Sequence, residues 1–365
     1  MAIDGASTIA MAPKLRFACT TLMPPSPVVA AATFAVAADL LPELGLADEG
    51  GTSFWIPGSY GSMAAVPPPP GWSLTIVNEY NAATAGGDVA AAREITIGRL
   101  SSAVTVNLNA NYKSSLDTFS INPTYAFATP IFGGTLELGA TASVAATTVG
   151  INGTLTVAAG PFVAVREGSI SSSIFGVGDV QPTAQLYWNS GVNNWTTYLT
   201  GGIPVGTYNS SSLANIGIGH GAVDGGAGYT FYDPKSGREF SVVTGLTYNL
   251  VNPSTDYQSG IDWHLDWGLS QTLTKAISVG AVGYAYDQIT GDSGAGDHLG
   301  AFESRVFGIG PQVGYSVAAG SLQANLNLKA YWEFEAAHRP SGWNAWATLT
   351  LSPNAPAPGK PVLVK

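Results

Sequence analysis

The chain has 365 residues, of which 10% are charged and 45% are apolar, and it contains 45 glycines. Soluble globular proteins carry about 25% charged residues, and the Gly, Ser, Thr and Asn that replace them here favour strands and turns over helices. The net charge of −10 argues against a nucleic-acid partner. The single cysteine, Cys19, lies in the segment assigned below to export, so the mature chain would have no intramolecular disulfide.

Residues 1–47 have the layout of an export signal. Lys14 and Arg16 precede an apolar run at residues 28–38, which is followed by charged and small residues. A membrane-spanning helix needs about 20 mostly apolar residues, so this run is too short to span. Candidate small-x-small cleavage motifs lie at residues 35–37 (Ala-Val-Ala) and 45–47 (Gly-Leu-Ala).

Residues 48–70 are rich in Pro, Gly and aromatic residues but have no periodic pattern. They can form a linker between the signal and the first strand. Alternatively, Phe54, Trp55 and Tyr60 can bury their rings inside the following domain as a plug. Both alternatives remain open from the sequence.

From residue 71 onward, apolar and polar residues alternate with a period of two, as they do in a strand whose two faces differ. The pattern is strictest at residues 104–113, 262–271 and 322–335, and the last segment is long enough to cross a membrane as a strand. Weaker copies lie at residues 135–144, 180–188 and 240–250.

A soluble β-sandwich also alternates, so the connections decide between the two architectures. Short turns are expected at residues 189–194, 233–238, 273–276 and 318–321. Longer Gly- and Asp-rich connections are expected between them, at residues 206–221, 251–258, 290–302 and 336–342. Short and long connections in alternation, with aromatic residues near the strand ends, are typical of membrane barrels.

We therefore predict an all-β fold, an antiparallel up-and-down transmembrane β-barrel of about 12–14 strands. The barrel would occupy residues 71–352 and be followed by a proline-rich tail at residues 353–365. Residues 129–178 define the strand number least well.

The pattern offers little for catalysis or metal binding. The four histidines lack metal-ligand spacing, and no cofactor motif is found. Asp262, His264 and Asp266 share one strand face, which would allow a carboxylate-oriented histidine in a hydrolase. We favour the simpler interpretation, a polar lumen wall, and expect no enzyme activity, no metal and no cofactor.

Polar side chains that the alternation places on the inner face are candidates for lining a channel. They would brace the wall through salt bridges, set a selectivity filter, or do both. These candidates are Lys113, Glu137, Asp179, Gln181, Gln185, Asp262, His264, Asp266, Arg305, Gln312, Lys329, Glu333 and Glu335.

Several motifs give the chain a family resemblance. They lie at residues 49–55 (Glu-Gly-Gly-Thr-Ser-Phe-Trp), 71–74, 127–130, 203–206, 213–222, 308–311 and 339–343 (Arg-Pro-Ser-Gly-Trp). With them the chain resembles the outer-membrane transporter-like family named for meta-pathway phenol degradation. The resemblance implies an exported outer-membrane barrel for the uptake of aromatic or hydrophobic compounds, and it brings no catalytic residues.

We therefore expect passive diffusion of hydrophobic or aromatic, phenol-type small molecules. The expected partners are these solutes, outer-membrane lipid and the barrel assembly machinery, and no nucleic acid. An outer-membrane hydrolase and a structural or adhesive barrel are the alternatives. The sequence leaves open the solute, the state of the lumen and the oligomeric state.

Overall fold

The computed structural model describes residues 53–85, 104–159, 162–296 and 303–354. The predicted export signal lies outside these ranges, as do residues 355–365 of the predicted tail. Within the described ranges, no helix has the length and apolar character needed to cross a membrane.

Strands make up most of the described chain. In chain order they are β1 (Gly71–Ala85), β2 (Val104–Ala126), β3 (Thr135–Ala159), β4 (Phe162–Val177), β5 (Gln181–Ser190), β6 (Asn193–Gly202), β7 (Ala222–Asp233), β8 (Arg238–Asn249), β9 (Tyr257–Gln258), β10 (Asp262–Thr272), β11 (Ile277–Gln288), β12 (Ser293–Gly294), β13 (Arg305–Ala319), β14 (Leu322–Ala337) and β15 (Ser341–Pro353).

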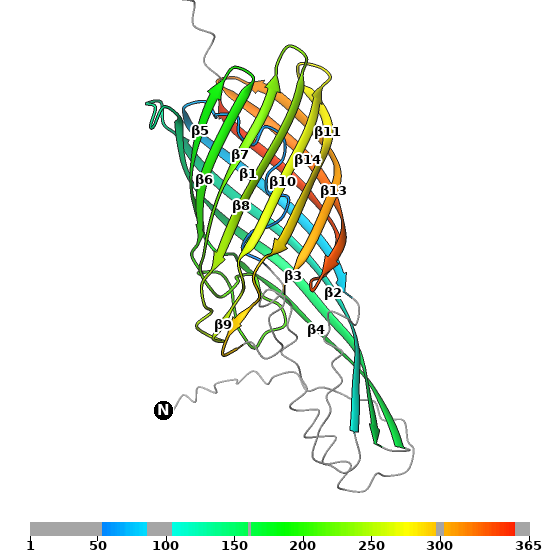
Figure 1. Cartoon of the computed structure of the whole chain (residues 1–365). Coiled ribbons are helices and arrows are strands. Elements are labelled where there is room, and N and C mark those ends of the chain that lie inside the picture. Colours follow the sequence, from blue (N-terminus) through cyan, green and yellow to red (C-terminus); the bar gives the residue numbers. More distant parts are fainter. Residues whose placement is uncertain (1–52, 86–103, 160–161, 297–302, 355–365) are drawn as a thin grey trace, which may run out of the picture.

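Antiparallel hydrogen bonding closes these strands into a barrel (Figure 1). β1 pairs with β15 and β2, and β2 pairs with β3, which completes the ring. β5 and β4 lie end to end along β3, opposite residues 135–141 and 144–159, so they form one strand of the wall and the barrel has 12 strands. The predicted antiparallel up-and-down transmembrane β-barrel is confirmed.

The two rims of the barrel differ in their connections. Short turns join β5 to β6, β7 to β8, β10 to β11 and β13 to β14 at one rim, as predicted. Connections at residues 203–221, 250–261 and 289–296 lie at the other rim, where the short strands β9 and β12 pair with each other. The expected long connection at 336–342 was wrong, because β14 continues to Ala337 and only residues 338–340 link it to β15. β2, β3 and β4 project past this long-loop rim (Figure 1).

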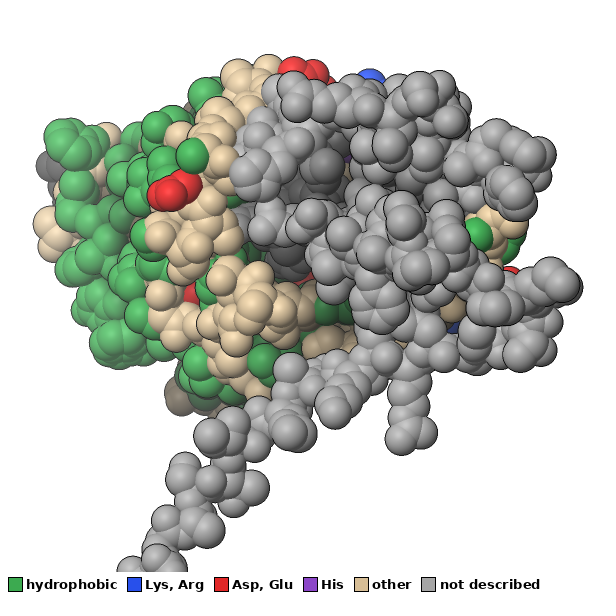
Figure 2. All heavy atoms as spheres, turned by 90° about the horizontal axis from the view of Figure 1, so that it is seen from below, with side chains coloured by type: hydrophobic (Ala, Val, Ile, Leu, Met, Phe, Trp, Pro, Cys, Tyr) green, Lys and Arg blue, Asp and Glu red, His purple; other side chains and the backbone are tan. Residues whose placement is uncertain are grey.

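The outer wall is apolar because the apolar side chains of each alternating strand lie on its outward face. On β14, Leu326, Leu328 and Trp332 are 36%, 47% and 66% exposed, whereas Lys329 and Tyr331 on the opposite face are buried. The view onto the long-loop end shows hydrophobic side chains over the visible outer wall (Figure 2). Exposed aromatic residues lie near both ends of the strands, as in the girdles of membrane barrels; they include Trp72, Trp195, Tyr248 and Trp343.

Candidate functional site: the barrel lumen

Residues 53–70, here called the inner segment, lie inside the barrel before β1 begins (Figure 1). Their apolar side chains pack against the inner wall. Phe54 is buried against Ile218 and Ala222, and Trp55 is buried with Tyr198 and Val243. The lumen therefore has an apolar and aromatic lining supplied partly by the wall and partly by the inner segment.

Trp55 is the centre of an aromatic stack. Its ring lies 3.7 Å from the His264 ring, centroid to centroid and nearly parallel, and 5.8 Å and 5.9 Å from the rings of Tyr60 and Tyr198. Burial, and then the nearby carboxylates of Asp224 and Asp266, raise the pKa of Tyr60 above its ordinary value. Its hydroxyl therefore stays protonated and donates to Gln185 Oε1 (3.3 Å).

Two opposite charges hold the backbone of the inner segment at one turn. The amides of Gly58 and Tyr60 donate to the two carboxylate oxygens of Asp266 on β10 (2.9 and 3.0 Å). The Lys329 ammonium on β14 donates to the carbonyls of Gly58, Ser59 and Tyr60. The turn requires Gly58, because its φ of +89° favours glycine and a Cβ there would meet the ring of Tyr331 at 3.0 Å. We call this arrangement the charge clamp.

Further polar residues of the wall continue along the inner segment. The Met63 amide donates to Glu239 (2.9 Å) and the Ala65 amide to Thr230 Oγ1 (2.9 Å). Gln312 Nε2 donates to Ser62 Oγ (2.6 Å). Backbone groups that would be unsatisfied inside the barrel thus find partners on β7, β8, β10 and β14.

Asp262, His264 and Asp266 on β10 face inward as predicted, but each contacts a different part of the lumen. Asp262 accepts a hydrogen bond from Asn249 (2.9 Å), and Asp266 belongs to the charge clamp. His264 Nε2 lies 2.9 Å from Asp224 Oδ2 and 3.3 Å from the Tyr198 hydroxyl. Because His264 is fully buried and covered by Trp55, a substrate cannot reach it in this arrangement.

Other predicted lumen residues also lie on the inner face. Glu137 accepts from the Tyr187 hydroxyl (3.1 Å), and Gln185 donates to Thr196 (3.0 Å). Gln181 shares this face through alternation with Gln185. Glu333 accepts from the Tyr284 hydroxyl (2.8 Å).

Four predicted lumen residues lie elsewhere. Lys113 is exposed on the outer face opposite Thr84, and Arg305 is exposed on the face opposite the buried Val306. Glu335 is exposed beside the irregular start of the β13–β14 pairing and has a φ of +53°, so strict alternation fails there. Asp179 lies between β4 and β5, where it accepts from the amides of Gly206 and Ile218 (2.7 and 2.9 Å) and so fixes a long loop.

Sequence reasoning missed several buried polar residues of the lumen. Asp224 pairs with His264, and Glu239 holds the inner segment. Asp224 precedes a glycine-rich stretch in which alternation is weak. Its inward direction follows only from the register, which places it opposite Thr247, the residue that donates to it (2.6 Å).

The pairing of β13 with β14 has a gap at the middle of the wall. Pairing between β13 and β14 runs to Ile309–Trp332 and resumes at Gln312–Lys329. Pro311, in the gap, has no backbone N–H to donate. A Cβ on Gly310 would lie 1.7 Å from the Ala330 carbonyl oxygen, so the strands touch closely without a ladder. We call residues 310–311 and 330–331 the seam.

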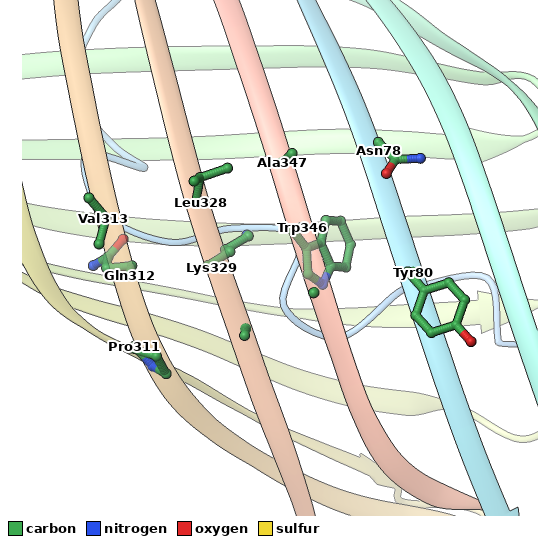
Figure 3. Close-up of a pocket in the computed structure, with 11 residues that line it drawn as sticks. Asn78, Tyr80, Pro311, Gln312, Val313, Leu328, Lys329, Trp346 and Ala347 are labelled. Carbon is green, nitrogen blue, oxygen red and sulfur yellow. The ribbon is translucent and has the colours of Figure 1, made fainter.

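A groove of about 440 Å³ lies against the seam, across β13, β14, β15 and β1 (Figure 3). Its outward-facing residues are mostly apolar and many are small. Alternation places Pro311, Val313, Leu328, Ala330, Ala345, Ala347, Asn78 and Tyr80 on this face. The groove thus offers an apolar site on the outside of the wall beside the seam.

Comparison with known proteins gives one family and several distant structures. No curated protein matches the chain. An outer membrane channel from Pseudomonas putida F1 is 15% identical, with a TM-score of 0.48 over 82% of this chain and 99% of that chain. A Pseudomonas aeruginosa FadL homologue is 9% identical (TM-score 0.33, 77% and 89% covered). The transport unit of the autotransporter AIDA-I from Escherichia coli is 10% identical (TM-score 0.36, 78% and 90% covered).

The family model described as the MetA-pathway of phenol degradation matches residues 97–349, which include most of the barrel. The chain therefore belongs to this family.

Proposed function

We propose that the chain is an outer-membrane channel that admits hydrophobic or aromatic small molecules by passive diffusion, after export on its N-terminal signal. The observation that carries the proposal is a closed barrel with an apolar outer wall around an aromatic and polar lumen. Among β-sheets, only closed ones satisfy all their backbone groups within lipid. The family's description, which names phenol degradation, supports aromatic compounds as the solutes.

A solute in the lumen has two routes, one along the barrel axis and one through the wall. The inner segment fills the lumen at the charge clamp, so a straight axial path requires this segment to move. The seam offers a lateral path, because residues 310–311 of β13 have no register partners on β14. A hydrophobic solute that passes the seam enters the outer groove and from there the bilayer, where its transfer from water is favourable.

The channel would have lipid and the assembly machinery as partners. Outer-membrane lipid would surround the exposed apolar wall, and barrel assembly machinery would insert the chain after export. The polar inner face, including Glu137, Gln185 and Glu333, would shape the path for the solute.

Flux of phenol into proteoliposomes tests the channel and its route together. A disulfide between Pro311→Cys and Ala330→Cys would lock the seam, and one between Val313→Cys and Leu328→Cys would cross-link neighbouring residues that are already paired. We expect the seam lock to slow phenol entry and a reductant to restore it, with no effect of the control lock. Flux no greater than in empty vesicles contradicts the channel, whereas equal flux in both locked forms contradicts only the lateral route.

A structural or adhesive role is a second candidate, supported by the projection of β2, β3 and β4 past the long-loop rim. Cell binding that survives when phenol flux is absent would favour it. Loss of binding on shortening this projection, with the barrel still folded, is the expected result for adhesion.

A further inference from the structure

The groove beside the seam lies on the outside of the wall and crosses four strands (Figure 3). Its floor is made by small side chains, among them Ala330, Ala345 and Ala347. Neighbouring strands lie about 4.8 Å apart, so the groove extends roughly 14 Å from β13 to β1. This length suits an extended hydrocarbon chain better than a single aromatic ring.

Bulky side chains border this floor on both sides. Val313 and Leu328 are exposed on the side of the short-turn rim. On the side of the long-loop rim, the next outward residues of β14 and β15 are the exposed Trp332 and Trp343. An apolar recess left empty in lipid would deprive its lining atoms of contacts on one side. An apolar chain that fills the recess restores these contacts.

The two ends of the groove differ in polarity. At the β1 end, Asn78 and Tyr80 add an amide and a phenolic hydroxyl to the lining. Tyr80 is the register partner of the exposed Asp117 on β2, whose carboxylate accepts from Asn78 (2.9 Å). At the β13 end the outward lining is apolar. The rings of Tyr80 and Trp343 lie 5.3 Å apart, as an aromatic pair at the level of the lipid head groups would.

Exposed charges of both signs lie beside the polar end. Asp117 and Lys113 are both on the outward face of β2, with Lys113 further toward the long-loop rim. A zwitterionic head group carries an ammonium and a phosphate, and so it complements both side chains. An anionic head group would instead meet a like charge at Asp117.

We infer that the groove binds one acyl chain of a zwitterionic glycerophospholipid. The head group lies at Asp117 and Lys113, the Tyr80 hydroxyl donates to an ester carbonyl of the lipid, and the chain extends from there toward β13. This site goes beyond the proposed channel function, because it depends only on the groove and on the outward face of the wall.

Native mass spectrometry of the purified chain, titrated in detergent with dipalmitoyl phosphatidylethanolamine, tests this site. The double substitution Ala345→Leu and Ala347→Leu fills the floor of the groove. Ala140→Leu with Ala142→Leu is the matched control, because these two alanines alternate in the same way on the outward face of β3. Faster migration of unheated than of boiled samples on SDS gels shows that each variant is folded.

We expect the wild-type chain to retain one lipid, with an affinity at least about tenfold weaker in the groove-filled variant and unchanged in the control. Losing the contacts of two methylene groups already corresponds to about a tenfold change in affinity. No retained lipid on the wild type, or equal affinities of the groove-filled and control variants, would overturn the inference.

Changes at the polar end test the placement of the head group. Tyr80→Phe and Asp117→Asn should each weaken lipid retention about threefold or more, and unchanged retention in both would overturn that placement. Dodecane, which lacks a head group, and dipalmitoyl phosphatidylglycerol, which is anionic, should compete poorly. Phosphatidylglycerol or lipopolysaccharide competing as well as the zwitterionic lipid would overturn its assignment. Absence of phenol flux in proteoliposomes would contradict the channel and leave this site standing.

Discussion

Removing the ammonium of the charge clamp should release the inner segment without opening the barrel. In Lys329→Met the stem remains, but the three donors to the carbonyls of residues 58–60 are lost. A hydrogen bond from a charged group contributes about 1.5–3 kcal/mol, and bonds that share one ammonium do not add fully. We take the net loss as about 3 kcal/mol. This value corresponds to a roughly 10²-fold larger population of the detached segment.

Thiol labelling measures this population. Ala65→Cys places a thiol at a fully buried position of the inner segment, and the mature chain would have no other cysteine once a signal containing Cys19 is removed. When closing is faster than labelling, the maleimide reaction rate follows the open population. We expect Lys329→Met to raise this rate by about 10²-fold.

Lys275→Met serves as the control, because Lys275 is exposed in the short turn between β10 and β11. It should leave the labelling rate unchanged. The barrel of both variants should still migrate faster on SDS gels when unheated, since no ladder bond is altered. An unchanged rate in Lys329→Met, or an equal rise in both variants, would refute the reasoning.

Three further changes test the lumen and the wall. Trp55→Ala removes the ring stacked on His264 and should lower stability by about 3–5 kcal/mol. The barrel should then lose its fast migration on SDS gels at a lower temperature. An unchanged temperature would show that packing of this ring does not stabilise the barrel. Gly310→Ala forces a Cβ toward the Ala330 carbonyl, so we expect β13 and β14 to separate and phenol flux to rise; slower flux would count against a lateral route. Asp224→Asn replaces the carboxylate oxygen that lies 2.9 Å from His264 Nε2 and accepts from Thr247. Weakening these buried hydrogen bonds should cost about 1.5–3 kcal/mol in urea unfolding, while an unchanged or more stable variant would show that these contacts are dispensable.

The wall was predictable because each of its strands obeys one local rule. In β14 the strict alternation from Leu322 to Phe334 identifies the lipid-facing set, and the structure exposes Leu326, Leu328 and Trp332 accordingly. The same rule gave the wrong face for Lys113. Alternation separates the two faces of a strand but does not say which one points inward, and a one-residue shift in register exchanges them. Which set faces inward on β2 is fixed only by its register with β1.

The contents of the lumen were less predictable because they depend on contacts distant in sequence. Residues 53–70 have no period, so the sequence can suggest that Trp55 is buried but cannot identify His264 as its partner. Pro311 is visible in the sequence as a residue that cannot donate to a ladder. Its place opposite Ala330, at a break between two strands, requires the register of the whole barrel.

The charge clamp joins residues that are far apart along the chain, and this separation constrains assembly. Gly58 meets Asp266 after 208 residues and Lys329 after 271 residues. The inner segment is thus made early, yet it finds its site only when β10 and β14 are already in the wall. Its docking would be a closing step of assembly, because such long-range contacts are delayed by the entropy of loop closure. Until that step the ring of Trp55 stays exposed, which distinguishes an unfinished barrel from a finished one.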